Sequence, residues 1–358
     1  MTEGGERSAP TAAVFERVDA LLDELDESAV RAHELGPLAA RRWRATGCPV
    51  PPDFVRMERA ATVSARLAIH VLERAASAYG GPLLVFKGPE IAERYQAGTR
   101  FFSDLDLLTD DAPAAQSALL AAGFTEVEDP EGAYADIHHL QPLRLPEIPL
   151  NLEVHSRPKW PSALPAPEVS EILAAAVPSR IPVSGLLAPA PAHHALIVVG
   201  HAWAHMPLRA IRALLDAEVV AAEADPAQIE SSAARWGAAR LWRADAAIRA
   251  WFFRGAREPA AVRLWGRHLR TGREPTVLAS HVERWLAPFW MLPAPAAARV
   301  SAGALAGDLT PEPGESRKAK AGRTARAARN ALRSHSEHGW DVREGPAPRR
   351  GGADGRRR

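Results

Sequence analysis

The most chemically distinctive stretch of the chain spans residues 83–109, LLVFKGPEIAERYQAGTRFFSDLDLLT. It opens with an apolar run typical of a β-strand, breaks at Lys87-Gly88-Pro89, and ends in a second strand pattern that carries Asp104 and Asp106. Residues two apart in a strand point to the same face, so we expect the two carboxylates side by side. Such a pair costs stability unless a cation lies between the acids. The pattern therefore predicts a site for a hard divalent cation, which commonly also holds substrate phosphates.

The order of these residues resembles a known superfamily. Lys87-Gly88, Arg100 and Ser103-Asp104-Leu105-Asp106 resemble the nucleotidyltransferases with the DNA polymerase β-like fold. More narrowly, they resemble an uncharacterised nucleotidyltransferase family that has Lys-Gly where most relatives have Gly-Gly or Gly-Ser. Pro89 replaces the usual small hydroxyl residue of that turn. The resemblance covers roughly residues 82–158 well and the following helices loosely.

The resemblance implies a catalytic metal site built from Asp104, Asp106 and a third carboxylate, which Glu153 matches. Glu153 lies in the strand pattern 150–155, where it shares a face with Asn151 and His155. An ordinary exposed strand glutamate is the alternative. Glu153 is also the candidate to take the acceptor's proton. The implied cofactor is Mg²⁺ or Mn²⁺, and the implied donor is a nucleoside triphosphate, with ATP favoured.

The resemblance also implies phosphate-binding residues, namely Lys87, Gly88, Arg100 and Ser103. Lys87 is notable because the chain has only four lysines among its 44 basic residues, and lysine suits phosphate contact in a tight turn. A lysine at a sheet edge is the alternative.

Candidates for the acceptor side are histidines and one acid on later helices and strands: His155, His201, His205 and Asp216. His201 and His205 stand four residues apart on a predicted helix, a spacing that also occurs in metal sites. No glutamate follows His201 in the zinc-protease pattern, so packing is the alternative for this pair. The sequence leaves the acceptor open among a small-molecule hydroxyl, a protein side chain and an RNA end.

Two other functions compete with nucleotidyl transfer. A catalytically inactive relative could keep the fold with its altered Lys87-Gly88-Pro89 turn and serve as a binding or accessory protein. A nucleotide-sugar glycosyltransferase could use Asp-x-Asp to hold a metal, but it would need a preceding doubly wound domain, which the helical N-terminus disfavours. The chain lacks GxSxG, GxxxxGK[ST], GxGxxG and CxxC motifs.

Length and composition indicate a globular protein of about two domains, since the chain has 358 residues and 24% charged residues. No apolar run approaches the ~20 residues of a membrane span, and the N-terminal sequence is not typical of a signal peptide. The single cysteine, Cys48, fits a cytoplasmic location. Residues 316–358 hold 13 basic and 4 acidic residues, a net charge of +9 in a chain of net charge +1. This tail could contact nucleic acid, but a solvated tail is the favoured interpretation.

These patterns predict an α+β fold, in which a nucleotidyltransferase-type mixed sheet with flanking helices precedes an all-helical domain and a disordered basic tail. The sheet is expected to have four or five strands between Leu83 and His155, including one over 137–145, with a loop over 129–135. Strand patterns largely disappear after Pro161. The seven tryptophans from Trp203 to Trp290 are predicted to pack between helices. The predicted units are an N-terminal helical segment (1–52), the catalytic domain (53–160), a helical domain (161–292) and a Pro/Arg-rich tail (293–358).

The helices predicted beyond the sheet come from apolar periodicity and from proline and glycine punctuation. They span 167–176, 193–205, 207–222, 226–253, 258–270 and 275–289, with a marginal helix at 319–333.

Overall fold

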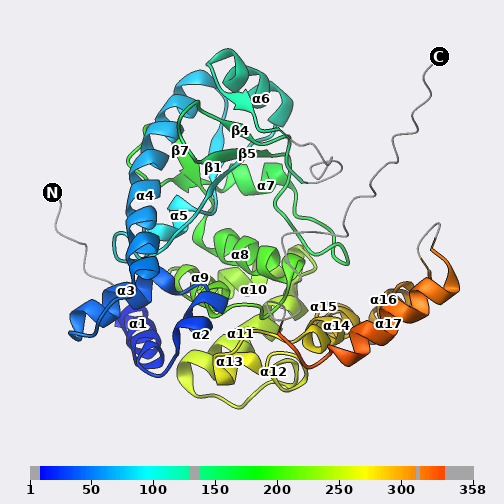
Figure 1. The fold of residues 1–358 in the computed structure, drawn as a ribbon. Helices are drawn as coiled ribbons and strands as arrows, with labels where there is room; N and C mark the ends of the chain where they lie inside the picture. The colour runs from blue at the N-terminus through cyan, green and yellow to red at the C-terminus, as the bar shows by residue number, and fades with distance from the viewer. Residues whose placement is uncertain (1–8, 129–137, 312–314, 335–358) are drawn as a thin grey trace, which may run out of the picture.

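A computed structural model describes residues 9–128, 138–311 and 315–334 of the chain. The predicted loop at 129–135, the first residue of the strand predicted at 137–145 and the last part of the tail lie outside these residues. In Figure 1 a twisted sheet lies in the upper half of the molecule, and helices fill the lower half.

The centre of the fold is a mixed sheet of seven strands with the order β3-β4-β5-β2-β1-β7-β6. Its strands are β1 (Leu83–Val85), β2 (Asp104–Leu108), β3 (Thr125–Glu126), β4 (Leu143–Arg144), β5 (Asn151–His155), β6 (Val177–Pro178) and β7 (Leu186–Ala188). Strand β2 is antiparallel to β1 and parallel to β5, and β1 is parallel to β7. The aspartate strand is therefore flanked on both sides and has no free edge.

The two faces of the sheet belong to two hydrophobic cores, because the side chains of each strand alternate. Val85 and Leu107 lie in the core formed with α4 (Pro52–Ala78) and α6 (Ala112–Ala121). Phe86 and Leu108 lie in the core formed with the C-terminal helices. The acidic residues of β2 alternate with its leucines, so they lie on the face toward the C-terminal helices.

Most of the remaining helices pack around this sheet and the second core, and α16 and α17 extend to one side (Figure 1). Those before or within the sheet region are α1 (Ala9–Leu22), α2 (Glu27–Ala32), α3 (Gly36–Ala45), α5 (Pro89–Ala92) and α7 (Val169–Ala174). Those after it are α8 (Pro191–His205), α9 (Ile211–Ala221), α10 (Pro226–Arg235), α11 (Ala239–Arg254), α12 (Ala260–Leu264), α13 (His268–Thr271), α14 (Val277–Leu286), α15 (Pro288–Met291), α16 (Ala294–Leu309) and α17 (Arg317–Arg329).

The α+β fold class is as predicted, and five strands lie between Leu83 and His155 as expected, but two further strands extend the sheet. Strands β6 and β7 follow Pro161, where the sequence predicted helices and loops, and β7 pairs with β1. At two and three residues, these strands are too short for an alternating pattern to reveal them. The strand expected over 137–145 is reduced to β4, and His139 forms an isolated bridge to His155.

Two of the predicted helices are interrupted by glycine. The helix expected over 226–253 is divided into α10 and α11 at Gly237, which has a φ of +66°. The helix expected over 258–270 is divided into α12 and α13, and Gly266 lies between them close to Leu208. A Cβ at Gly266 would lie 2.9 Å from Leu208 Cδ1 and 3.0 Å from Val262 Cα. Close packing therefore favours glycine at this break.

Both ends of the described chain form helices, as expected at the N-terminal end but not at the C-terminal end. Phe15 of α1 packs edge-on against Tyr95, with ring centroids 5.3 Å apart. At the other end, α16 packs on α14 and α15, although the sequence predicted disorder from residue 293. Runs of alanine with high helix propensity explain both C-terminal helices.

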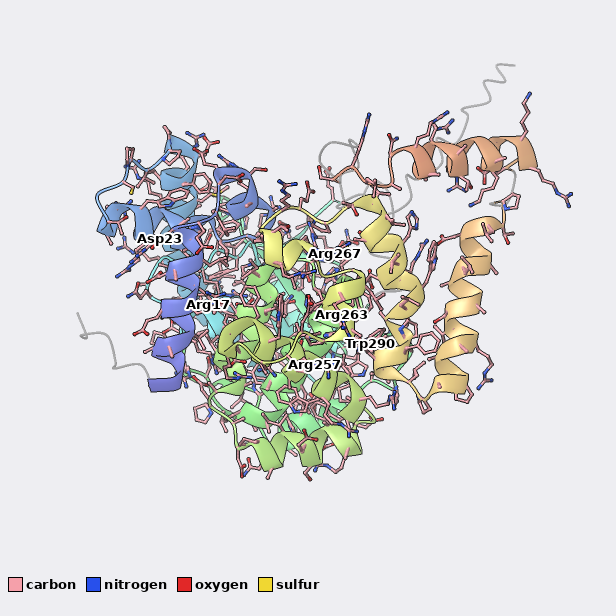
Figure 2. All side chains as sticks on the ribbon, turned by 90° about the horizontal axis from the view of Figure 1, so that it is seen from below. Arg17, Asp23, Arg257, Arg263, Arg267 and Trp290 are labelled. Carbon is pink, nitrogen blue, oxygen red and sulfur yellow. The ribbon has the colours of Figure 1, made fainter. Side chains whose placement is uncertain are left out.

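The tryptophans pack between helices, as predicted. Trp203, Trp236, Trp242 and Trp265 are buried. Trp265 meets Trp290 with ring centroids 4.9 Å apart, and Trp290 is labelled in the view from below (Figure 2). Among the described residues, no helix has both the length and the apolar character needed to cross a membrane.

Candidate functional site

A sharp turn after β1 begins the site. Gly88 has a φ of +51°, in the region that favours glycine, and a Cβ there would lie 2.8 Å from the backbone oxygen of Asp104. The turn is therefore pressed against the start of β2. Glycine is required both for the backbone angle and for this close approach.

The parallel pairing of β2 with β5 brings the acidic and histidine side chains together. Asp106 lies opposite Glu153, and Leu108 lies opposite His155. His155 Nε2 lies 2.9 Å from Asp106 Oδ1 and 3.6 Å from Glu153 Oε2. Both His155 and Asp106 are 1% exposed, whereas the Glu153 side chain is 18% exposed. The cluster is therefore buried on one side and reached by solvent at Glu153.

Lys87 is the cation nearest to Asp106. Its Nζ lies 3.2 Å from a carboxylate oxygen of Asp106, and its side chain is 17% exposed. Burial alone would raise the pKa of Asp106, but the charges of Lys87 and His155 outweigh burial and hold that pKa well below its usual range. Burial likewise opposes the charge on Lys87, yet the neighbouring aspartates raise its pKa. Both groups are therefore ionised at neutral pH.

Asp104 lies in a different electrostatic environment. Burial and the negative charge of Asp106 raise the pKa of Asp104 above its usual value. Its carboxylate is outside the group of ligand atoms formed by Asp106, Glu153 and His155. The structure thus brings two of the three predicted metal ligands together and adds His155, which the sequence placed on the acceptor side.

This group fits a divalent cation. One ligand atom from each of Asp106, Glu153 and His155 lies within 4.8 Å of the others. Asp106 Oδ2 is the ion-pair partner of Lys87 Nζ at 3.2 Å, and His155 Nε2 lies 2.9 Å from Asp106 Oδ1. Neither atom has a further hydrogen bond of good geometry among the described residues, so both have the capacity to serve as metal ligands. Two carboxylates and an imidazole are a suitable donor set for a metal ion.

Arg100, predicted to contact phosphate, is engaged in an internal network. Its guanidinium donates two hydrogen bonds to Asp216, of 2.8 and 2.9 Å, and one of 2.7 Å to the backbone oxygen of Gly88. Asp216 also accepts hydrogen bonds from Tyr95 and Arg212. Arg100 therefore holds the Gly88 turn through the backbone oxygen of Gly88, and Asp216 holds Arg100 in place.

The other predicted site residues lie around the cluster. Ser103 is exposed, immediately before β2. His201 and His205, on the last turns of α8, have ring centroids 4.9 Å apart. Burial and the charge of Lys87 lower the pKa of His201 well below its usual value, so the ring is neutral at pH 7. The C-terminal end of α8 therefore brings two imidazoles toward the acidic strands.

Sequence reasoning missed two residues at this site, Lys159 and His139. The Nζ of Lys159 lies 2.6 Å from His205 Nε2, and burial together with the charge of Lys87 lowers the pKa of Lys159 to about 8. His139 Nε2 lies 3.5 Å from Glu153 Oε2. The rarity of lysine in this chain was a signal that could have found Lys159. No local pattern marked His139, because its contact depends on the pairing of β5 with the preceding segment.

Comparison with known proteins gives one match. No curated protein and no solved structure matches the chain. A family model described as "Uncharacterised nucleotidyltransferase" matches residues 27–253. That match includes the Lys87-Gly88 turn, both acidic strands and α8, so it spans every element of the site described above. Since it covers more than half of the 358 residues, the chain belongs to the uncharacterised nucleotidyltransferase family.

Proposed function

We propose that the chain transfers a nucleoside monophosphate from a nucleoside triphosphate, with ATP as the first candidate, to a hydroxyl-bearing acceptor. Pyrophosphate is the second product. The observation that carries this proposal is the parallel pairing that sets Asp106 opposite Glu153 with His155 beside them. A buried acidic pair with the capacity to bind a metal ion, next to a glycine turn and a lysine, is suited to a metal–triphosphate complex.

Each residue of the site would have its own role in this reaction. Asp106, Glu153 and His155 would hold a divalent cation, which supplies neutralisation of the triphosphate and activation of the acceptor hydroxyl. Lys87, ionised at the Gly88 turn, supplies positive charge for the leaving pyrophosphate. Asp104, close enough to Asp106 for their charges to interact, supplies a further carboxylate. Arg100 keeps the turn in place through Gly88.

The acceptor's proton needs a base close to the cluster. Glu153 is one candidate, and its side chain is the most exposed of the three metal-site ligands. His201 is another, because a neutral imidazole can accept a proton. Lys159 and His205 contact each other and would bind the acceptor. The basic residues of the tail would add contacts if the acceptor is a nucleic acid.

A second candidate function is supported by the contact between Lys87 and Asp106. In a non-catalytic relative, the ammonium of Lys87 would itself replace the metal ion, and the fold would serve binding alone. Lys87 and a protonated His155 would balance Asp106 and Glu153 without a metal ion in that case. We favour the metal-dependent enzyme because the family match spans the turn, both acidic strands and α8.

The experiment that tests the proposal is an acceptor screen with ATP labelled on either the α- or the γ-phosphate. Small hydroxyl compounds, the protein itself and RNA are offered in separate reactions. Nucleotidyl transfer predicts that the α-label moves to the acceptor while the γ-label appears in pyrophosphate. Asp106→Asn should abolish transfer, whereas Asp110→Asn, an exposed aspartate just after β2, should not. Transfer of the γ-label, or transfer that survives Asp106→Asn, would contradict the proposal.

A further inference from the structure

The third member of the ligand group is an imidazole held in one orientation. His155 is 1% exposed and ends β5. The ring of Phe86 meets it edge-on, with centroids 5.1 Å apart, and the rings of His138 and His139 lie 5.0 and 5.2 Å away. This packing leaves Nε2 directed at the carboxylates. The ring cannot turn away without disturbing the core behind it.

The contact of His155 with Asp106 has the spacing of two metal ligands. Adjacent ligands of an octahedral ion at ~2.1 Å lie about 3 Å apart. His155 Nε2 is 2.9 Å from Asp106 Oδ1 and 3.6 Å from Glu153 Oε2. The spacing fits coordination of one ion by both groups. It also fits an ion pair, since Asp106 and Glu153 outweigh burial and raise the pKa of His155, so a bound ion would replace the proton on Nε2.

We propose that Nε2 of His155 is a direct ligand of the metal ion, and that the site consequently selects Mn²⁺ over Mg²⁺. Mg²⁺ is a hard ion that prefers oxygen ligands and keeps its waters, whereas Mn²⁺ accepts imidazole nitrogen together with carboxylates. Replacing one carboxylate ligand by an imidazole also removes one negative charge from the donor set, which weakens Mg²⁺ binding further. This inference rests on the proposed function for the existence of a metal site and adds the identity of the ion.

The first test measures affinity on the full chain without nucleotide. The free Mn²⁺ signal in electron paramagnetic resonance reports binding, and competition with Mg²⁺ gives the ratio of the two dissociation constants. The wild-type chain should prefer Mn²⁺ by at least about tenfold. His155→Gln, which offers an amide oxygen near the position of Nε2, should weaken Mn²⁺ binding about 10- to 100-fold and reduce the preference. His70→Gln changes an exposed histidine on α4, away from the ligand group, and should leave both constants unchanged.

The second test detects the nitrogen directly. Electron spin-echo envelope modulation of bound Mn²⁺ should show coupling to imidazole nitrogen in the wild-type chain and in His70→Gln, and should lose it in His155→Gln. Circular dichroism melting checks that each variant is folded, and His155→Asn replaces the glutamine variant if that one does not fold. Mn²⁺ that is bound without nitrogen coupling, or coupling that persists in the His155 variant, would overturn the proposal.

These outcomes separate the inference from the proposed function. Tight binding of Mn²⁺ or Mg²⁺ through oxygen ligands alone would reject His155 as a ligand and leave metal-dependent nucleotidyl transfer standing. Absence of any divalent binding, with or without ATP, would reject both.

Discussion

At the scale of the residue, Asp104 and Asp106 show how two identical side chains on one strand acquire different properties. Asp106 is buried against two cationic groups, and its pKa is lowered. Asp104 is half-buried, is repelled by Asp106, and has a raised pKa. The surroundings therefore stabilise the ionised form of Asp106 and destabilise the ionised form of Asp104.

Substituting each aspartate by asparagine should therefore have opposite effects on stability. Asp106→Asn leaves the ammonium of Lys87 partly unpaired in a buried site and should destabilise the fold by about 3 kcal/mol. Asp104→Asn relieves repulsion and should be neutral or stabilise by up to about 1 kcal/mol at pH 7. The pKa of Asp104 is higher in the folded chain than in the unfolded chain. The stability gained by Asp104→Asn should therefore shrink as the pH falls from the folded pKa toward the unfolded pKa. Urea unfolding of both variants checks this, and equal destabilisation by the two changes would argue against the assigned electrostatics.

Lys159 should titrate near pH 8, because burial and the charge of Lys87 disfavour its protonated form. The unfolded chain keeps this proton up to the ordinary lysine pKa of 10.5, so this residue should make stability rise between about pH 8 and that value. Only four lysines are present, so lysine-labelled protein gives a simple nuclear magnetic resonance spectrum, and Lys159→Arg assigns the signal. A side-chain midpoint above pH 10 would show that the residue is solvated instead.

At the scale of the element, the site depends on one turn and one strand pairing. The turn at Gly88 sets the start of β2, and the register of β2 with β5 sets Asp106 opposite Glu153. A shift of this register by one residue would move every acidic side chain to the other face of the sheet. Buried leucines on the opposite face oppose such a shift.

Gly88→Ala should disrupt the site more than the fold. An alanine there has an unfavourable φ, at a cost of about 1–2 kcal/mol, and its Cβ would press on the backbone of Asp104. We expect a lower melting temperature and at least a tenfold loss of metal affinity, measured by Mn²⁺ binding. Gly123→Ala is the matched control, since that glycine also has a positive φ but has open space around it. Equal losses of affinity in both variants would refute a specific role for the Gly88 turn.

The elements that carry the site were predictable from the sequence for a physical reason. Alternation of apolar and acidic residues in β2 and β5 assigns each side chain to a face before any partner strand is known. Alternation does not say which strand lies beside which, so the position of His155 in the ligand group could not be inferred. The short strands β6 and β7 had no periodic signal, and their place beside β1 is decided by tertiary packing.

At the scale of the whole molecule, one buried ionic network ties the site to distant parts of the chain. Asp216 of α9 binds Arg100, which holds the Gly88 turn, and also Arg212, which pairs with Glu34 near the N-terminus. These residues are far apart in sequence, so no local pattern could reveal their contacts. The helices after the sheet and the N-terminal segment therefore both support the Gly88 turn.

Asp216→Asn should test this coupling. The change leaves the buried guanidinium of Arg100 without its counter-ion, and such a loss typically costs about 3–5 kcal/mol. It should also loosen the Gly88 turn and weaken metal binding, although Asp216 is not a ligand. Glu34→Gln, which removes only the more exposed partner of Arg212, should cost less than about 1 kcal/mol and leave metal binding intact. Thermal melting and Mn²⁺ titration report the two effects, and a stable Asp216→Asn variant with normal affinity would contradict the coupling.

The most direct test of the central claim is the calorimetric titration of ATP into the full chain with and without a divalent cation. We expect saturable binding of one ATP per chain in Mn²⁺, none in the presence of a chelator, and loss of that binding in Asp106→Asn but not in Asp110→Asn. Binding of equal strength in the chelator, or binding that Asp106→Asn leaves unchanged, would contradict a metal-dependent nucleotide site.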